Sequence, residues 1–415
     1  MVSFDRETDM STEEGRFIKA WVLSFILLAV ISAVFICMED PYLLLGMPRV
    51  QGLNASKPAA ATHLALMKAY DVFRFRPKTL ILGSSRAALG LDDLDLAWPQ
   101  EHRPIYNLAL PAAGSDVAYR YLVHSLSRNS SVSLVVLSVE FEYWIEFVNR
   151  GEDELTSHIS IESDGRRSAN PRQIMLRDFF MATFSLAALH DSFATLTAYV
   201  RNDPEDLNAG NWTGAWWVES ERFRLVPYYA FARGDLDFLR FFLTKPFTPR
   251  PTAAVRAIAE LCQERNIHLI VVLSPSHAEE SEMLSRLGYS QAIEGWKRGL
   301  VALTTQYGAE LWDFDDYNFF TTEVVPKVKQ PMRWFFDPEH YSHELGHEML
   351  KRIFYSGDPR LGSRLTPQNV ESHLQEIRQH QHAFQQEYRR EVQTVGQLYE
   401  AVVRAEKSSR RAEGP

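Results

Sequence analysis

Cysteine is scarce in this chain of 415 residues, which contains only two. Cys37 lies inside an apolar run and Cys262 lies inside an expected helix, so a disulfide between them would have to join a membrane segment to a folded domain. We therefore expect two free thiols. The sequence also lacks Cys and His residues at the spacing of a zinc site, and we expect no bound metal.

Basic residues are outnumbered by acidic ones, which gives a formal net charge of -9 and a pI near 5.8. Because phosphate binding needs a concentrated basic surface, this balance argues against nucleic acid as the principal partner. The glycine patterns of P-loop and dinucleotide-binding enzymes are missing as well, so we expect no cofactor. Hydrophobic residues make up 46% of the chain, enough to bury a substantial core.

Only one long uncharged run is present, over residues 20–38. A membrane-spanning helix needs about 20 apolar residues, so this run predicts a single crossing. Arg16 and Lys19 precede the run and Glu39 and Asp40 follow it, which places the N-terminus in the cytoplasm and the rest of the chain outside. A cleaved signal peptide is the alternative, but the run does not end in a small-x-small site. We expect a retained anchor in a bacterial inner membrane and a periplasmic domain.

Five short apolar runs bounded by turn residues follow a predicted linker over residues 39–70. They predict strands at Thr79–Leu82, Ile105–Leu108, Leu134–Val139, His268–Leu273 and Glu310–Phe314. Because helical patterns lie between several of these runs, we predict an α/β domain over residues 71–355. Its expected core is a five-stranded parallel sheet in a three-layer sandwich, with ligands at the carboxyl ends of the strands.

Two segments depart from this alternation. Residues 145–250 are predicted to form an inserted helical and aromatic cap, whose aromatic rings could stack on sugars or could simply pack in a core. These rings belong to Trp212, Trp216, Trp217, Tyr228 and Tyr229. Residues 356–415 are predicted to form one long amphipathic helix and a polar tail. That helix could cover its own domain or could contact a partner.

Two distant segments carry residues that could perform chemistry. Gly83-Ser84-Ser85-Arg86 follows the first predicted strand, and Asp337-Pro338-Glu339-His340 opens a predicted helix. An Asp three residues before a His can bond the imidazole and fix its tautomer, so that the other ring nitrogen can take a proton from a serine. The two segments therefore predict a serine acyl-transfer site.

With these motifs, the chain resembles the SGNH/GDSL hydrolase superfamily. Ser85 stands where that family has its nucleophile, and we prefer it to Ser84 by position. Asp337 and His340 are similar to the family's terminal Asp-x-x-His. The segment from Asn107 to Gly114 is similar to its second block, so the resemblance implies that the Ser85 and Gly114 amides are oxyanion donors.

The resemblance is incomplete after the third predicted strand. The family has Gly-x-Asn-Asp there, whereas this chain has Glu140-Phe141-Glu142-Tyr143. The third oxyanion donor is therefore unassigned. Either another residue replaces it, or turnover is low, or the site binds without reacting.

One anchored branch of the superfamily is similar to this chain in its overall arrangement. That branch includes alginate O-acetyltransferases and the D-alanyl-transfer proteins of teichoic acid modification, which act beside a multispan membrane acyltransferase. The resemblance implies an acyltransferase, usually of acetyl, that acts on an envelope or secreted polysaccharide. An esterase with the same triad and a non-catalytic polysaccharide-binding or assembly subunit are the alternatives.

Further residues could line the pocket of such a site. Ser84 and Asn107 lie in the two motifs, and Arg86 could attract a carboxylated polymer or merely pair with a nearby acid. His277 could line the pocket or could be a turn residue at the surface. His343 and His347 lie one helical turn apart but lack a clear third metal ligand.

Overall fold

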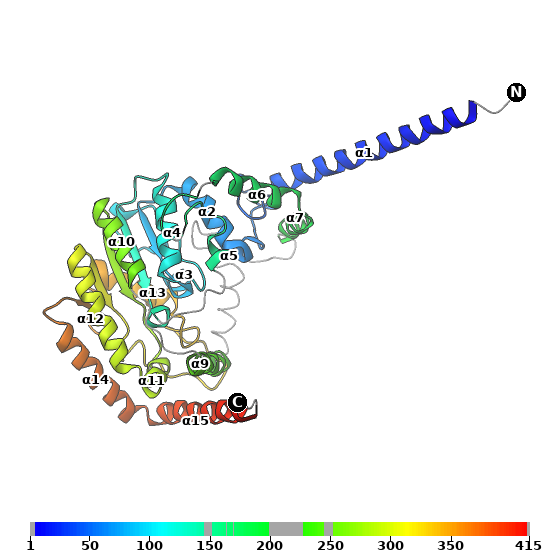
Figure 1. The fold of residues 1–415 in the computed structure, drawn as a ribbon. Coiled ribbons are helices and arrows are strands. Elements are labelled where there is room, and N and C mark those ends of the chain that lie inside the picture. The colour runs from blue at the N-terminus through cyan, green and yellow to red at the C-terminus, as the bar shows by residue number, and fades with distance from the viewer. Residues whose placement is uncertain are drawn as a thin grey trace.

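The computed structural model describes residues 5–144, 152–162, 164–168, 170–198, 227–244 and 252–412. One long helix, α1 (Asp5–Glu39), projects from a central sheet that is covered by helices (Figure 1). Within α1, Glu14–Glu39 is long and apolar enough to cross a membrane, and most of its side chains are exposed. A helix with the length and apolarity that a spanning segment requires is therefore present where the sequence predicts one. The two cysteines are unpaired, as predicted.

The central sheet has six strands in the order β2-β1-β3-β4-β5-β6. They are β1 (Thr79–Leu82), β2 (Ile105–Asn107), β3 (Leu134–Val139), β4 (His268–Leu273), β5 (Glu310–Asp313) and β6 (Ser363–Leu365). The first five match the predicted runs and pair in parallel. β6 pairs antiparallel with β5, so the prediction of five parallel strands was wrong. β6 was missed because it has three residues, of which only Leu365 is buried.

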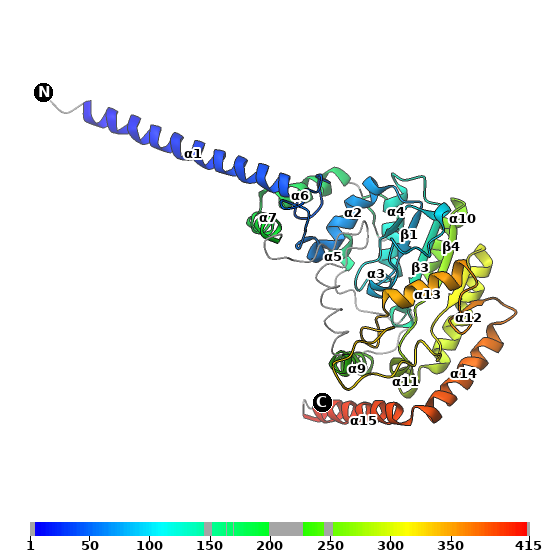
Figure 2. The ribbon, with the colours of Figure 1, turned by 180° about the vertical axis from the view of Figure 1, so that it is seen from behind.

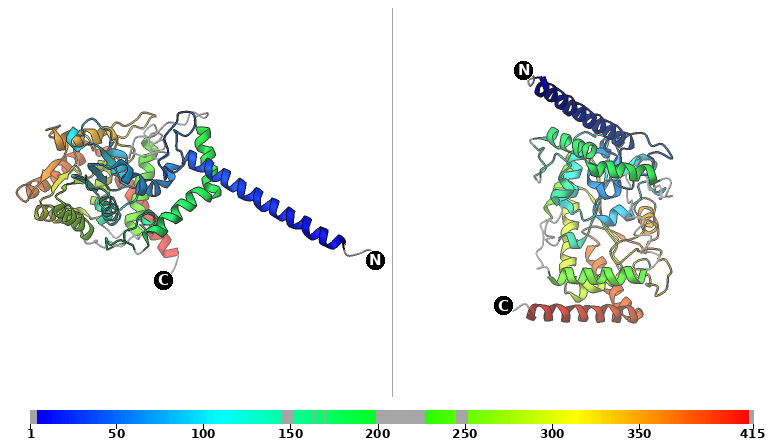
Figure 3. Two further views of the ribbon diagram at one scale, coloured as in Figure 1. Left: turned by 90° about the horizontal axis from the view of Figure 1, so that it is seen from above. Right: turned by 90° about the vertical axis from the view of Figure 1, so that its right-hand side faces the viewer.

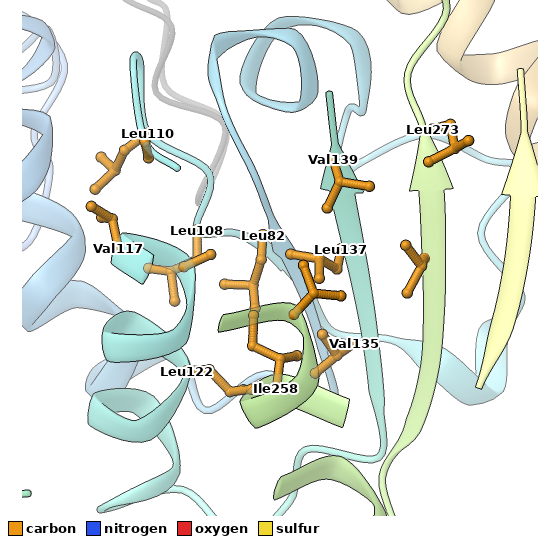
Figure 4. Packing of buried hydrophobic residues seen from close by; sticks show 14 of the residues in the cluster. Leu82, Leu108, Leu110, Val117, Leu122, Val135, Leu137, Val139, Ile258 and Leu273 are labelled. Atoms are coloured by element: carbon orange, nitrogen blue, oxygen red, sulfur yellow. The ribbon is translucent and has the colours of Figure 1, made fainter. Parts of the chain in front are cut away.

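Helices cover both faces of the sheet because alternate strand residues point to opposite sides. Leu80 and Leu82 of β1 belong to one core and Ile81 belongs to the other. Helices α2 (Leu64–Phe75), α4 (Ser115–Leu126), α10 (Ala253–Glu264) and α12 (Ser290–Tyr307) cover the first face. Figure 4 shows the leucine and valine side chains of β1 and β3 packed against α4 and α10.

The second face is covered by α3 (Ser85–Gly90) and α13 (His343–Phe354). Figure 2 shows both helices in front of the strands. Loop residues add to this layer, including Trp98 near the short helix η2 (Gln100–His102). This face contains both segments that sequence motifs single out, so the layer arrangement brings them to the same side of the sheet.

The folded domain begins before residue 71, earlier than expected. After the short helix η1 (Ala60–His63), α2 packs in the core, and its Met67 and Val72 are completely buried. The predicted linker was therefore too long at its C-terminal end. Its apolar residues at helical spacing are the signal that could have revealed α2.

The short helix η3 (Phe141–Trp144) precedes the inserted segment. The described part of the insertion contains α5 (Glu152–Thr156), α6 (Pro171–Phe184), α7 (Leu186–Ala198) and α9 (Pro227–Thr244), and an antiparallel bridge between Ile161 and Arg167. Trp212, Trp216 and Trp217 lie outside the described residues. Tyr228 and Tyr229 are exposed in the first turn of α9.

The C-terminal segment forms two helices, α14 (Val370–Glu387) and α15 (Arg389–Ala412), instead of the single long helix that was predicted. Helical dihedrals are interrupted at Tyr388, whose ring stacks on Phe384. The bend lets the chain follow the domain surface, because α14 packs on α12 whereas α15 packs on α9 and α11 (Ala278–Arg286). Figure 1 shows α15 at the end of the molecule opposite α1.

Candidate active site

Ser85 is presented by a sharp turn from β1 into α3. Gly83 has φ of +146°, and a Cβ there would lie 2.8 Å from the Ser138 Cβ of β3, so a side chain is excluded. Ser84 is the N-cap of α3, because its hydroxyl accepts the Arg86 N–H at 3.2 Å. Ser84 is buried, whereas Ser85 is partly exposed. The turn thus uses one hydroxyl for structure and leaves the next one accessible.

Asp337 shapes the loop that carries His340. Its Oδ1 atom accepts the backbone N–H of Glu339 at 2.9 Å and that of His340 at 2.8 Å. Such local bonds favour a turn over an extended chain, and proline at position 338 restricts the turn further. The loop is closed at its base, where Phe335 and Tyr341 form an isolated antiparallel bridge. The carboxylate therefore holds both the backbone and the ring of His340.

The predicted triad comes together although its members lie 255 positions apart. His340 Nε2 lies 2.8 Å from Ser85 Oγ. His340 Nδ1 lies 2.8 and 2.9 Å from the two carboxylate oxygens of Asp337. The tautomer that satisfies both contacts has Nδ1–H donating to Asp337 and Nε2 accepting from the Ser85 hydroxyl. This is the arrangement that lets a histidine act as a general base.

Two glycines allow the elements that carry this triad to touch. A Cβ at Gly346 of α13 would lie 1.7 Å from the carbonyl oxygen of Gly90, the last residue of α3. A Cβ at Gly90 would lie 1.9 Å from the ring of Tyr341. The contact of α3 with α13 and with Tyr341 just before it therefore depends on the absence of side chains at both positions. Sequence reasoning missed these glycines, because neither occupies a turn or a strand end.

The electrostatics of the pair suit a proton acceptor. Burial lowers the pKa of His340, but Asp337 and Glu339 outweigh burial and raise the pKa above its ordinary value. Burial raises the pKa of Asp337, but the His340 ring and two backbone N–H groups outweigh it and lower that pKa. Asp337 is therefore held as a carboxylate, which would stabilise an imidazolium at His340.

Ser85 opens into a pocket of about 210 Å³. The pocket is lined by Ser84, Ser85, Arg86, Glu142, Asp237, Phe238, Phe241, Phe242 and Glu339. Helix α9 supplies the phenylalanines, which gives the pocket one apolar wall. Three carboxylates, one guanidinium and two serines form the polar lining. Sequence reasoning missed Glu142 and the α9 residues, while Glu339 lies inside the recognised Asp-x-x-His motif.

Arg86 is held by acidic and hydroxyl groups of other elements. Its guanidinium donates to Glu280 of α11 at 2.8 Å, to Glu142 of η3 at 3.2 Å and to Ser276 at 2.8 Å. Burial lowers the pKa of Arg86, but the surrounding carboxylates outweigh burial and raise it. Of the two interpretations of Arg86, pairing with nearby acids is therefore the one that the contacts favour. The ion pairs fix the start of α3 against two neighbouring elements.

Two other predicted pocket residues have structural contacts. The Asn107 side chain donates to the carbonyl oxygens of Ala87 and Leu91, and it accepts the Ala109 N–H. His277 is the N-cap of α11 and accepts the Glu279 N–H. It is buried, and burial lowers its pKa to about 4. Neither side chain is among the residues that line the pocket beside Ser85.

Two further segments are candidate sources of oxyanion donors, namely Gly114 and the residues that follow β3. Gly114 stands at the N-cap of α4 and is not among the residues that line the pocket, so its role as an oxyanion donor stays a prediction. In the segment where the resemblance would place Gly-x-Asn-Asp, the chain has Glu140 instead of the glycine and Glu142 instead of the asparagine, and Glu140 accepts from the Ser138 hydroxyl at 2.8 Å. Glu142 then pairs with Arg86. In their ionised form, both side chains are acceptors and offer no donor to an oxyanion.

The two neighbouring histidines of α13 have separate surroundings. His347 Nδ1 lies 2.7 Å from a carboxylate oxygen of Asp95, and His343 lies 3.5 Å from Glu344. Within the described part of the chain, no three His, Cys, Asp or Glu side chains are grouped so that they could hold a metal ion.

Comparison with known proteins adds no relative. No family model matches the sequence, no curated protein matches it, and no solved structure matches its fold. The chemistry of the site therefore has to be argued from its own geometry.

Proposed function

We propose that the chain is a membrane-anchored serine acyltransferase of the SGNH type. The observation that carries this proposal is the continuous contact from Asp337 through His340 to Ser85, with 2.8 Å between the imidazole nitrogen and the hydroxyl. Serine becomes a useful nucleophile when a neighbouring base can take its proton. The accessible Ser85 beside an oriented imidazole meets that requirement.

The proposed reaction proceeds through an acyl-serine. Ser85 Oγ attacks the carbonyl carbon of an ester or thioester donor while its proton passes to His340 Nε2. The bond between the carbonyl carbon and the leaving group then breaks, and the leaving group takes that proton. An acceptor hydroxyl next attacks the acyl-Ser85 ester and gives its proton to His340. The acyl group leaves Ser85 for the acceptor, and His340 returns the proton to Ser85.

The pocket favours a short acyl group and an acceptor without negative charge. Its volume of about 210 Å³ lies below the roughly 300–1,000 Å³ typical of sites for larger small molecules. The phenylalanine wall of α9 suits an acetyl methyl group. Glu142, Glu339 and Asp237 would repel a polyanion. Among the described residues of the lining, Arg86 is the one cation, and two carboxylates already pair with it. A neutral polysaccharide hydroxyl is the acceptor that we propose.

The anchor suggests where the reaction takes place. Helix α1 is long and apolar enough to span a bilayer, and acidic residues follow its apolar run. We propose a single-pass protein of a bacterial inner membrane with the catalytic domain on the periplasmic side. A multispan membrane acyltransferase would then be a suitable source of acyl groups on that side.

Hydrolysis by the same triad is the nearest alternative, since water could replace the sugar hydroxyl. A non-catalytic polysaccharide-binding subunit is a second alternative. It is favoured by the carboxylates of Glu140 and Glu142, which lie in the segment after β3 where the resemblance would place Gly-x-Asn-Asp. The two alternatives differ in whether Ser85 reacts at all.

A fluorophosphonate probe tests that difference, because it labels only an activated serine. We expect labelling of the full-length protein in detergent, loss of labelling in Ser85→Ala and retention in Ser84→Ala. A fold measurement by circular dichroism on each variant guards against unfolding. Absence of labelling in the wild-type protein would support the binding subunit. Loss in Ser84→Ala alone would move the nucleophile to the neighbouring serine.

Transfer and hydrolysis are separated by the product. The full-length protein is given 4-nitrophenyl acetate with a neutral or a polyanionic oligosaccharide, and products are identified by mass spectrometry. We expect acetylation of the neutral acceptor. Release of acetate without any acetylated oligosaccharide, also in the presence of a multispan partner, would assign the protein as an esterase.

A further inference from the structure

Helices α6 and α7 carry an unusual number of large apolar side chains on their exposed surface. Leu176, Phe180 and Met181 are 59–63% exposed, and Leu186 at the bend is 85% exposed. The full set is Met175, Leu176, Phe179, Phe180, Met181, Phe184, Leu186 and Phe193. Exposed apolar patches of this kind mark surfaces that contact a protein, a ligand or a membrane.

The buried side of the same helices consists mainly of small and polar residues. In α7, Ala188, Ser192 and Thr195 are almost completely buried, and the Ser192 hydroxyl donates to the Ala188 carbonyl oxygen at 2.7 Å. In α6, Ala182 and Asp178 are buried. A helix of a water-soluble domain has the opposite pattern, with large apolar residues inside and polar residues outside. Small residues inside and large apolar residues outside are typical of helices that face lipid.

Both helices contact the C-terminal part of α1. The Phe193 ring lies 5.0 Å from the Phe35 ring, and Ala182 and Ala188 share a buried cluster with Ile36. Phe35 lies four residues before Glu39, where the apolar run ends, which corresponds to about 6 Å along the helix. The helix pair therefore meets α1 at the level where a spanning helix would leave the hydrocarbon.

The geometry of the pair fits the surface zone of a bilayer better than a crossing. Helices α6 and α7 have 14 and 13 residues, so each is about 20 Å long and cannot span a core of about 30 Å. A bend of 60° separates them. Figure 3 (left) shows both helices running across the axis of α1.

The pair is also fixed to the domain and flanked by positive charge. Asp178 of α6 accepts a hydrogen bond from Tyr70 of α2 at 2.8 Å, which ties the pair to the core. Arg167 and Arg172 are exposed just before and within the first turn of α6, whereas Arg166 lies 3.5 Å from the carboxylate of Asp164. Basic residues beside an apolar face favour contact with lipid phosphates.

From these observations we infer that α6 and α7 form an interfacial helix pair that inserts its apolar face into the outer leaflet of the bilayer crossed by α1. The inference rests on the proposed anchor and goes beyond the proposed activity. It gives the domain a second attachment point, so that the catalytic domain would be held in a fixed orientation to the membrane.

Spin-label accessibility in reconstituted protein tests the proposal. The full-length chain with Cys37→Ser is placed in vesicles of phosphatidylcholine with a minor fraction of phosphatidylglycerol. Cys262 is retained because it is buried. Single labels are attached at Phe180→Cys, at Leu27→Cys in α1, and at Gln386→Cys at the end of α14. Leu176→Cys repeats the measurement in case one label disturbs the helix. Collisions with oxygen report lipid, and collisions with a nickel chelate report water.

We expect the oxygen-to-nickel collision ratio at positions 176 and 180 to exceed that at position 386 several-fold and to approach that at position 27. A lipid-like ratio at position 27 with a water-like ratio at positions 176 and 180 would overturn the interfacial pair while leaving the anchor. Protection of positions 176 and 180 from both reagents would also overturn it, since protein would then cover the face. A water-like ratio at position 27 would contradict the anchor and, with it, this inference.

Discussion

Among the described residues, two histidine–aspartate pairs have a buried imidazole, and only one of them contacts a serine hydroxyl. In the first, His340 bonds Asp337 through Nδ1 and Ser85 through Nε2. In the second, His373 Nε2 lies 3.0 Å from Asp313 Oδ2. Lys297 Nζ lies 2.8 Å from the same carboxylate oxygen. Distances within the two pairs are nearly equal.

The difference lies in what surrounds each pair. Ser85 and Glu339, which contact or adjoin His340, line the pocket, whereas no residue of the second pair lines it. Asp313 ends β5, and its partners come from α12 and α14, so the second pair joins three elements. A histidine–aspartate contact therefore suggests chemistry only where the second imidazole nitrogen contacts a hydroxyl that lines a pocket. Elsewhere it is a structural contact. The comparison predicts that equal substitutions in the two pairs have opposite consequences.

The largest expected effect is on the reactivity of Ser85 in Asp337→Asn. An asparagine cannot hold the His340 tautomer or stabilise the imidazolium, so the rate of fluorophosphonate labelling should fall by about 10⁴-fold. The free energy of unfolding should change far less. A labelling rate within a few-fold of wild type would show that Asp337 does not orient the base.

Asp313→Asn is the matched substitution in the second pair. It leaves Lys297 buried without a full countercharge, which costs about 3–5 kcal/mol of stability in comparable sites. Labelling of Ser85 in the folded fraction should stay near the wild-type rate. Burial raises the pKa of Asp313, but Lys297 and His373 outweigh burial and hold it below the ordinary 3.8. Its contribution is therefore complete at neutral pH and is lost on acidification, so the urea denaturation that measures this cost is done near pH 7.

Sequence reasoning found the first pair and overlooked the second for a physical reason. Asp337 and His340 lie three residues apart, so a local turn can join them, and the pattern is visible in one segment. Asp313 and His373 lie in elements 60 positions apart, and only the packing of α14 against the sheet joins them. The same limit explains β6 and the break at Tyr388, which depend on the surface that the C-terminal segment covers. Strands β1 to β5 were predictable because each is a short buried run between turn residues.

The pocket residues follow the same rule. Ser85 could be predicted to lie at the site because it follows a strand. For Arg86, Asn107 and His277, the neighbouring residues in the sequence did not reveal whether the side chain lines the pocket or makes structural contacts. Their roles depend on which carboxylates and carbonyls reach them from other elements. Polar residues near a motif are therefore weak predictors of a pocket, because burial against other segments decides between a structural and a functional role.

A smaller effect is expected where the two halves of the triad are packed together. In Gly346→Ala, the new methyl group would overlap the Gly90 carbonyl oxygen, so α3 and α13 must move apart. Overpacking of this kind costs about 1–3 kcal/mol. The same movement should lengthen the contact between Ser85 and His340 and slow labelling more than the stability loss explains. Denaturation and labelling kinetics measure the two effects.

Gly299→Ala is the matched control for that substitution. Gly299 lies inside α12, and nothing is within 4 Å of the position of its Cβ. Alanine is favoured over glycine in a helix interior by about 0.5–1 kcal/mol, so this variant should be more stable and should be labelled normally. Equal destabilisation by both alanine substitutions would contradict the packing argument.

The smallest expected effect is a shift in pH dependence. Labelling should slow on acidification through the pKa of His340, because an imidazolium cannot accept the Ser85 proton. Glu339 raises that pKa, so Glu339→Gln should lower it and move the midpoint of the acid limb to lower pH. Glu348→Gln is the control, since that residue pairs with Lys351 on α13 and should leave the midpoint unchanged. A midpoint that moves to higher pH in Glu339→Gln would contradict the electrostatic account of the base.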